Sequence, residues 1–100
     1  MLAVNPILLT GDKPFSGEKV AEAIRLAIIA ELDAVNLYEQ MARLVEDERF
    51  KKVFLDIARE EKAHVGEFLA LLLELDPEQV KELKKGFEEI KELTGIETKI

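Results

Sequence analysis

The chain has no cysteine, which excludes disulfide bonds, thiolate-bound metals and catalysis by a cysteine nucleophile. It also lacks a long hydrophobic run: the longest is Phe68–Leu73, far short of the roughly 20 residues that a membrane-spanning helix needs. Basic residues are fewer than acidic ones, 14 against 21, and the net charge of −7 argues against nucleic acid or an anionic membrane as a partner. Since no signal peptide is evident at the start, we expect one small cytoplasmic domain.

Residues 1–15 show no helical pattern. Pro6 and Pro14 interrupt this segment, so we expect an irregular N-terminal arm. Hydrophobic residues then recur at spacings of three and four, which predicts a helix from about residue 17 to 44 or 45, with Ser16 as a candidate N-cap. The apolar positions of this helix are Val20, Ile24, Ala27, Ile28, Val35, Tyr38, Met41 and Val45.

Two further helices follow. The same periodicity predicts a second helix over residues 48–75, capped by Asp47. The run Asp76-Pro77-Glu78-Gln79 indicates a new helix start, with Asp at the N-cap, Pro at the first helical position and Gln completing a capping box. This third helix should stop at Gly95. The chain therefore divides into an arm (1–15), a helical domain (16–95) and a tail (96–100).

The expected fold is all-α. The short connection near residue 47 makes the first two helices an antiparallel hairpin, and a short C-terminal helix follows. Segments 26–35 and 63–73 are hydrophobic around most of the helix circumference, and a helix of that kind must be buried on all sides. Since a hairpin and one short helix cannot cover so much surface, we expect a second copy of the chain to complete a four-helix bundle by dimerisation.

Three polar residues break the hydrophobic stripes. Glu31 falls on the apolar face of the first helix, and Glu61 and His64 fall on that of the second, one turn apart. Burying a carboxylate without a compensating charge costs roughly several kcal/mol, so a positive charge should lie beside these side chains. Carboxylate oxygens and a neutral imidazole nitrogen are ligands that iron or manganese accepts.

This ligand pattern is half of a known set. Ferritin-like di-metal bundles take a Glu from each of two helices and a Glu-x-x-His from each of the other two, so two copies of this chain would supply the whole set. The alternative is structural: a buried Glu–His pair between the helices, with Arg25 or Arg59 contributing charge. The residues alone leave both interpretations open.

Longer motifs carry a family resemblance. Residues 30–40 read AELDAVNLYEQ, residues 58–64 read AREEKAH, and a DPE turn begins at Asp76. Together they resemble the encapsulated ferritins, truncated ferritin-like proteins that reside inside encapsulin nanocompartments. The resemblance covers about residues 17–95.

The resemblance implies a function. It implies that Glu31, Glu61 and His64 are both the metal ligands and the catalytic residues of a di-iron site bridging two subunits. It further implies a ring-like homo-oligomer and an encapsulin shell as partner, with Fe(II) and dioxygen as substrates of a ferroxidase that serves iron storage. The position of Tyr38 lies beside the metal site in that family, which suggests a hydroxyl that bonds a ligand carboxylate. Asp33 matches a position near the family's iron entry path, although helix geometry places it off the Glu31 face.

Two rival functions remain. A rubrerythrin-like peroxidase uses related ligands, but it normally needs a second, cysteine-bound iron, and this chain has no cysteine. A non-enzymatic helical oligomerisation module would keep the Glu–His pair for structural reasons only. Iron titration under air distinguishes the three.

Overall fold

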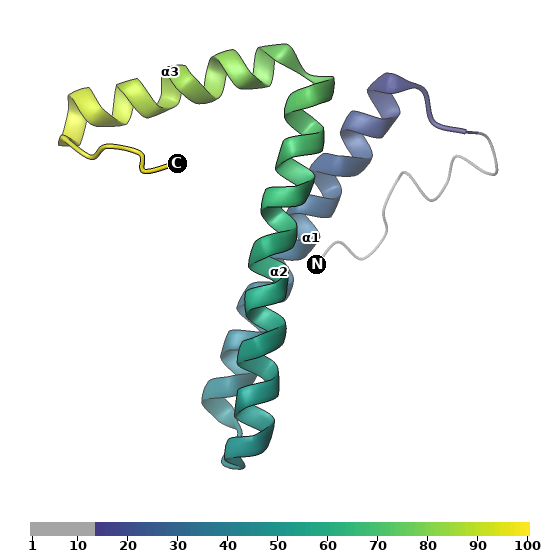
Figure 1. The fold of residues 1–100 in the computed structure, drawn as a ribbon, viewed down its shortest axis with the longest axis vertical. Coiled ribbons are helices and arrows are strands. Elements are labelled where there is room, and N and C mark those ends of the chain that lie inside the picture. Colours follow the sequence, from purple (N-terminus) through teal and green to yellow (C-terminus); the bar gives the residue numbers. More distant parts are fainter. Residues whose placement is uncertain (1–13) are drawn as a thin grey trace.

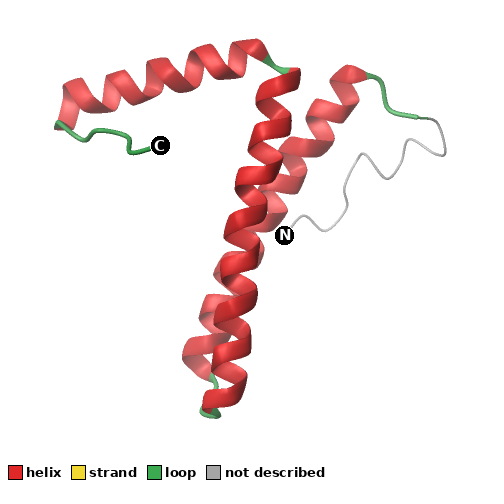
Figure 2. Ribbon diagram, viewed as in Figure 1, coloured by secondary structure: helices red, strands yellow, loops and turns green. Residues whose placement is uncertain are grey.

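A computed structural model describes residues 14–100 and shows three helices (Figure 1). They are α1 (Gly17–Leu44), α2 (Glu48–Leu75) and α3 (Pro77–Thr94). No strand occurs within the described residues (Figure 2). The expected all-α fold is confirmed, and each helix begins and ends within a residue of the predicted position. Most of the expected N-terminal arm, residues 1–13, lies outside the described part of the chain.

Helices α1 and α2 form the antiparallel hairpin, joined by residues 45–47 (Figure 1). Asp47 caps α2 as expected: Oδ1 accepts a hydrogen bond from the Arg49 amide at 2.9 Å, and Oδ2 accepts from Arg49 Nη2 at 2.8 Å. These bonds to Arg49 hold the pKa of the Asp47 carboxyl below its ordinary value. Ser16 lies at the N-cap of α1, but its side chain makes no capping hydrogen bond. Glu18 in the first turn suits the positive end of the helix dipole instead.

The core between the two long helices is thin. Among the described residues, no polar or charged residue is buried. The buried residues are small or aliphatic: Ala21, Ile24, Val35, Ala42, Ala58 and Leu72. Many larger hydrophobic side chains stay exposed on both helices, among them Leu32 on α1 and Val53 on α2, each with more than half of its surface accessible. Two helices can bury only one stripe each, so most of the apolar surface that the sequence carries remains uncovered in a single chain.

Helix α3 turns away from the hairpin at its upper end (Figure 1). Asp76 caps it, with Oδ1 accepting from the Gln79 amide at 3.2 Å, and Pro77 occupies its first turn. It ends at Gly95, whose φ of 78° lies in the left-handed region that favours glycine. No residue of α3 is buried.

None of the helices in the described part of the chain is long and apolar enough to cross a membrane.

Candidate metal centre

The structure brings Glu31, Glu61 and His64 together at the middle of the hairpin. Glu31 comes from α1, and the other two come from α2, where a spacing of three places them on one face. One ligand atom from each residue lies within 4.8 Å of the others. The three residues predicted from the broken hydrophobic stripes therefore form one cluster.

The contacts inside the cluster are long. His64 Nδ1 lies 3.5 Å from Glu31 Oε2 and 3.5 Å from Glu61 Oε2, whereas a charge-assisted hydrogen bond is typically about 2.7–2.9 Å. Glu31 Oε2 is buried and has no hydrogen-bond partner. The side chains of Glu31 and Glu61 are 18% and 20% exposed, whereas that of His64 is 43% exposed. The cluster is thus enclosed by the hairpin on one side and open on the other.

No arginine compensates the two carboxylates. Arg25 pairs with Asp76 at 2.9 Å, and Arg59 pairs with Asp56 at 3.2 Å on its own helix. Within residues 14–100, no lysine or arginine forms an ion pair with Glu31 or Glu61. The structural alternative, in which Arg25 or Arg59 supports a Glu–His pair, therefore loses its proposed cations.

The donor set fits a hard or borderline first-row metal ion. A buried carboxylate oxygen without a donor is costly, by about 1–3 kcal/mol, and a cation placed among the three ligand atoms would satisfy it. Oxygen and imidazole donors suit iron or manganese. Three donors leave an octahedral ion incompletely coordinated, which is what half of a shared site would provide.

The side chains of Tyr38, Glu60 and Glu67 make no hydrogen bond to those of the cluster in the described part of the chain. The Tyr38 ring stacks on Phe54, with 6.5 Å between centroids and 12° between planes. Among the described residues its hydroxyl donates no hydrogen bond to the cluster, so its proposed role beside a ligand stays a prediction. Glu60 and Glu67, which flank His64 along α2, are exposed.

One nearby contact was not predicted from the sequence. Lys62 Nζ on α2 lies 2.9 Å from Glu39 Oε2 on α1, so an ion pair joins the helices next to Glu61. Helical spacing puts both residues to one side of the buried stripe, but a single sequence with many charges of both signs does not specify which pair forms.

A helical hairpin that presents one Glu from the first helix and a Glu-x-x-His from the second has the architecture of the ferritin-like carboxylate proteins. Comparison with known proteins agrees. Residues 22–99 match the rubrerythrin family. The chain belongs to this family.

Similar proteins include examples from Pyrococcus furiosus and Myxococcus xanthus. The chain is 70% identical over 100 residues to a ferritin-like–encapsulin shell fusion protein of Pyrococcus furiosus, and it spans 29% of that protein's length. The crystal structure of the encapsulated ferritin domain from Pyrococcus furiosus superposes with a TM-score of 0.87 at 69% identity, covering 98% of this chain and all of that one. The encapsulin nanocompartment cargo protein EncC of Myxococcus xanthus is 33% identical over 95% of this chain and 73% of its own length. The resemblance to the encapsulated ferritins is confirmed.

Replacing Glu31 with leucine should stabilise the metal-free protein. The substitution removes a buried oxygen that lacks a hydrogen-bond donor, and replacing buried charges with apolar groups of similar volume often gains about 1–4 kcal/mol. Urea denaturation of chelator-treated protein measures this. Leu72→Ala serves as a control that must destabilise, because Leu72 is buried in the core. If Glu31→Leu instead destabilised the metal-free protein as strongly as Leu72→Ala, the Glu–His pair would be a structural contact.

Proposed function

We propose that two copies of the chain pair across the open side of the cluster and form a di-iron centre that oxidises Fe(II). The single observation that carries this proposal is the cluster of Glu31, Glu61 and His64 donor atoms within 4.8 Å, with one buried carboxylate oxygen left without a partner. Two such clusters give four carboxylates and two imidazoles, the set found in ferritin-like di-metal bundles. In the paired site, Glu61 and His64 of each chain would hold one iron, and the Glu31 carboxylates would be shared between the two irons.

The surface around the open side supports this pairing. Val53, Leu71 and Leu75 share the face of α2 that carries His64, since they lie eleven, seven and eleven positions from it, and all three are exposed. An apolar surface continuous with an incomplete site is what a second copy would cover. Burial against that copy would also remove His64 from water.

The ligand set explains the direction of the reaction. Anionic oxygen ligands favour the harder, more highly charged Fe(III), so they promote the loss of an electron from Fe(II). With one Fe(II) held by each half-site, the centre supplies two electrons to one dioxygen molecule, and two protons complete hydrogen peroxide. The chain's own residues hold the two substrate ions at a fixed separation, which makes the two-electron step possible.

The relatives suggest where the reaction takes place. One similar protein is a fusion to an encapsulin shell, and two, EncC and EncB, are encapsulin nanocompartment cargo proteins. We propose that this domain likewise works inside an encapsulin nanocompartment in the cytoplasm, where Fe(III) passes to a stored mineral. The acidic surface, with a net charge of −7, would attract Fe(II) toward the site.

Iron titration tests the proposal. Fe(II) is added to metal-free protein under air, and separately under argon with hydrogen peroxide, while Fe(III) absorbance and oxygen consumption are recorded. We expect fast oxygen-dependent oxidation that saturates near one iron per chain. Faster turnover with peroxide than with oxygen would favour a rubrerythrin-like peroxidase, and no turnover above the protein-free rate would favour an oligomerisation module.

A further inference from the structure

A single residue joins α2 to α3. Helix α2 ends at Leu75 and α3 begins at Pro77, so Asp76 alone forms the corner, with φ −131° and ψ 86°. Proline has no amide hydrogen to continue the hydrogen bonds of α2. The direction of α3 therefore depends on the backbone of Asp76 and on whatever holds that residue in place.

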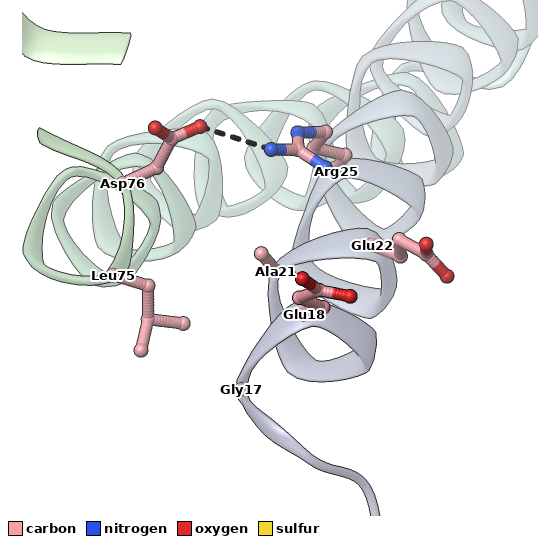
Figure 3. A pocket seen from close by; sticks show the side chains of 7 residues that line it. All are labelled: Gly17, Glu18, Ala21, Glu22, Arg25, Leu75 and Asp76. Carbon is pink, nitrogen blue, oxygen red and sulfur yellow. Dashed lines mark hydrogen bonds and ion pairs between the residues drawn. The ribbon is translucent and has the colours of Figure 1, made fainter. Parts of the chain in front are cut away.

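Both carboxylate oxygens of Asp76 are engaged. Oδ1 accepts from the Gln79 amide at 3.2 Å, inside the first turn of α3. Oδ2 accepts from Arg25 Nη2 on α1 at 2.9 Å, as the close view shows (Figure 3). The side chains of Arg25 and Asp76 are 47% and 25% exposed, so the pair is partly shielded from water. One carboxylate thus fixes the start of α3 and ties it to α1.

Backbone hydrogen bonds from the Asp76 amide to Leu72 O and from the Gln79 amide to Asp76 O hold the corner, but few other side-chain contacts restrain it. No residue of α3 is buried, and among residues 14–100 the Arg25–Asp76 pair is the one ion pair between α1 and this corner. An open pocket of about 360 Å³ lies beside it, lined in part by Glu18 and Glu22 (Figure 3). The pocket leaves open space between the corner and the start of α1, while Leu72, one turn before the corner, packs against Ala21 and Ile24.

The charges around the pocket determine which way α3 would move if the Arg25–Asp76 ion pair were lost. Without Arg25, the pocket would be lined by three acidic residues, Glu18, Glu22 and Asp76, with no cation among its lining residues. Like charges repel, so the corner and α3 would move away from α1. We infer that the Arg25–Asp76 ion pair is a latch that sets the direction in which α3 leaves the hairpin, and thereby the assembly that the chain forms with other copies.

The link to assembly follows from what α3 carries. Its hydrophobic residues Phe87, Ile90 and Leu93 are exposed, so the direction of α3 decides where this stripe meets another chain. This last step rests on the self-association in the proposed function. The direction of α3 within one chain does not.

The distance between a spin label on α1 and one on α3 measures the direction of α3 directly. Because the chain has no cysteine, cysteines placed at exposed Asn36 on α1 and Glu92 on α3 give one labelled pair per chain, and dilution with unlabelled chains removes signals between copies. We expect a single narrow distance peak in the parent. Arg25→Met should broaden it and shift it to longer distance. Asp76→Asn should do the same, although asparagine still caps α3. About 1 M salt should also broaden and lengthen the distance in the labelled parent, in which Arg25 and Asp76 are unchanged, since it reduces the Debye length to about 3 Å.

Arg59→Met is the matched control, since it removes an ion pair within α2, and it should leave the peak unchanged. Circular dichroism confirms that each variant keeps its helices, and light scattering on the iron-loaded protein should show an altered mass for Arg25→Met. An unchanged distance peak in both Arg25→Met and Asp76→Asn overturns the latch. A shifted peak with unchanged mass overturns its link to assembly. Failure of Fe(II) oxidation in the parent would affect neither distance result.

Discussion

Glu61→Ala and His64→Ala are each expected to lower the rate of Fe(II) oxidation by at least about 100-fold, since losing even an outer partner of a metal ligand typically costs about 10- to 100-fold. Each substitution removes a terminal ligand from both irons of the paired site, because both chains carry it. Glu31→Ala removes both bridging carboxylates and should be equally damaging to two-electron oxidation, while single irons still bind through Glu61 and His64. Stopped-flow absorbance after mixing with Fe(II) under air measures the rates.

The folded state should survive these substitutions, because they remove polar groups that the metal-free protein leaves without good hydrogen bonds. Glu60→Ala is the matched control: Glu60 precedes Glu61 on α2 and is exposed, so this variant should oxidise iron at the parent rate. Full activity in Glu31→Ala, or loss of activity in Glu60→Ala comparable to that in Glu61→Ala, would contradict the assignment of the ligands.

Adding Fe(II) anaerobically to metal-free protein should shift it from monomer or dimer toward a larger assembly. The metal-free pair brings four carboxylates close together, and their mutual repulsion opposes association. Iron that binds only the assembled state stabilises it by about 2.7 kcal/mol when the free ion is at 100 times its dissociation constant, which is roughly a hundredfold change in the association equilibrium.

Size-exclusion chromatography with light scattering measures this shift. His64→Ala should abolish it, whereas Glu60→Ala should preserve it. Mg²⁺ at the same concentration is an ionic-strength control, because it prefers to keep its water ligands and accepts imidazole poorly. Equal masses with and without Fe(II) would exclude metal-driven assembly but leave the metal site itself untouched.

The helices could be predicted from the sequence because local signals specify their ends. Asp47 and Asp76 cap α2 and α3 as their side chains predicted, and Gly95 ends the last helix in the left-handed conformation. Ser16 shows the limit of such signals: it occupies the N-cap of α1 without forming the expected side-chain bond. A residue occupies the N-cap position wherever the helix begins, whether or not its hydroxyl accepts a hydrogen bond from the first turn.

The cluster was predictable because helical periodicity fixes which side chains share a face. Periodicity predicts toward which face of the helix a side chain points, but it does not predict how deeply that side chain is buried. The sequence predicted inward-facing polar groups, and the single chain leaves the His64 side chain 43% exposed. The partner of Arg25 could not be predicted either: it lies 51 residues away at Asp76, across a corner whose geometry no local pattern encodes.

Anomalous diffraction at the iron edge, from crystals grown without oxygen and soaked in Fe(II), tests the shared site most directly. The account predicts two iron peaks between each pair of chains, each bound by Glu61 and His64 of one chain, with the Glu31 carboxylates lying between the two metals. Iron found only on surface carboxylates, with Glu31, Glu61 and His64 in contact with one another and no anomalous peak among them, would contradict it.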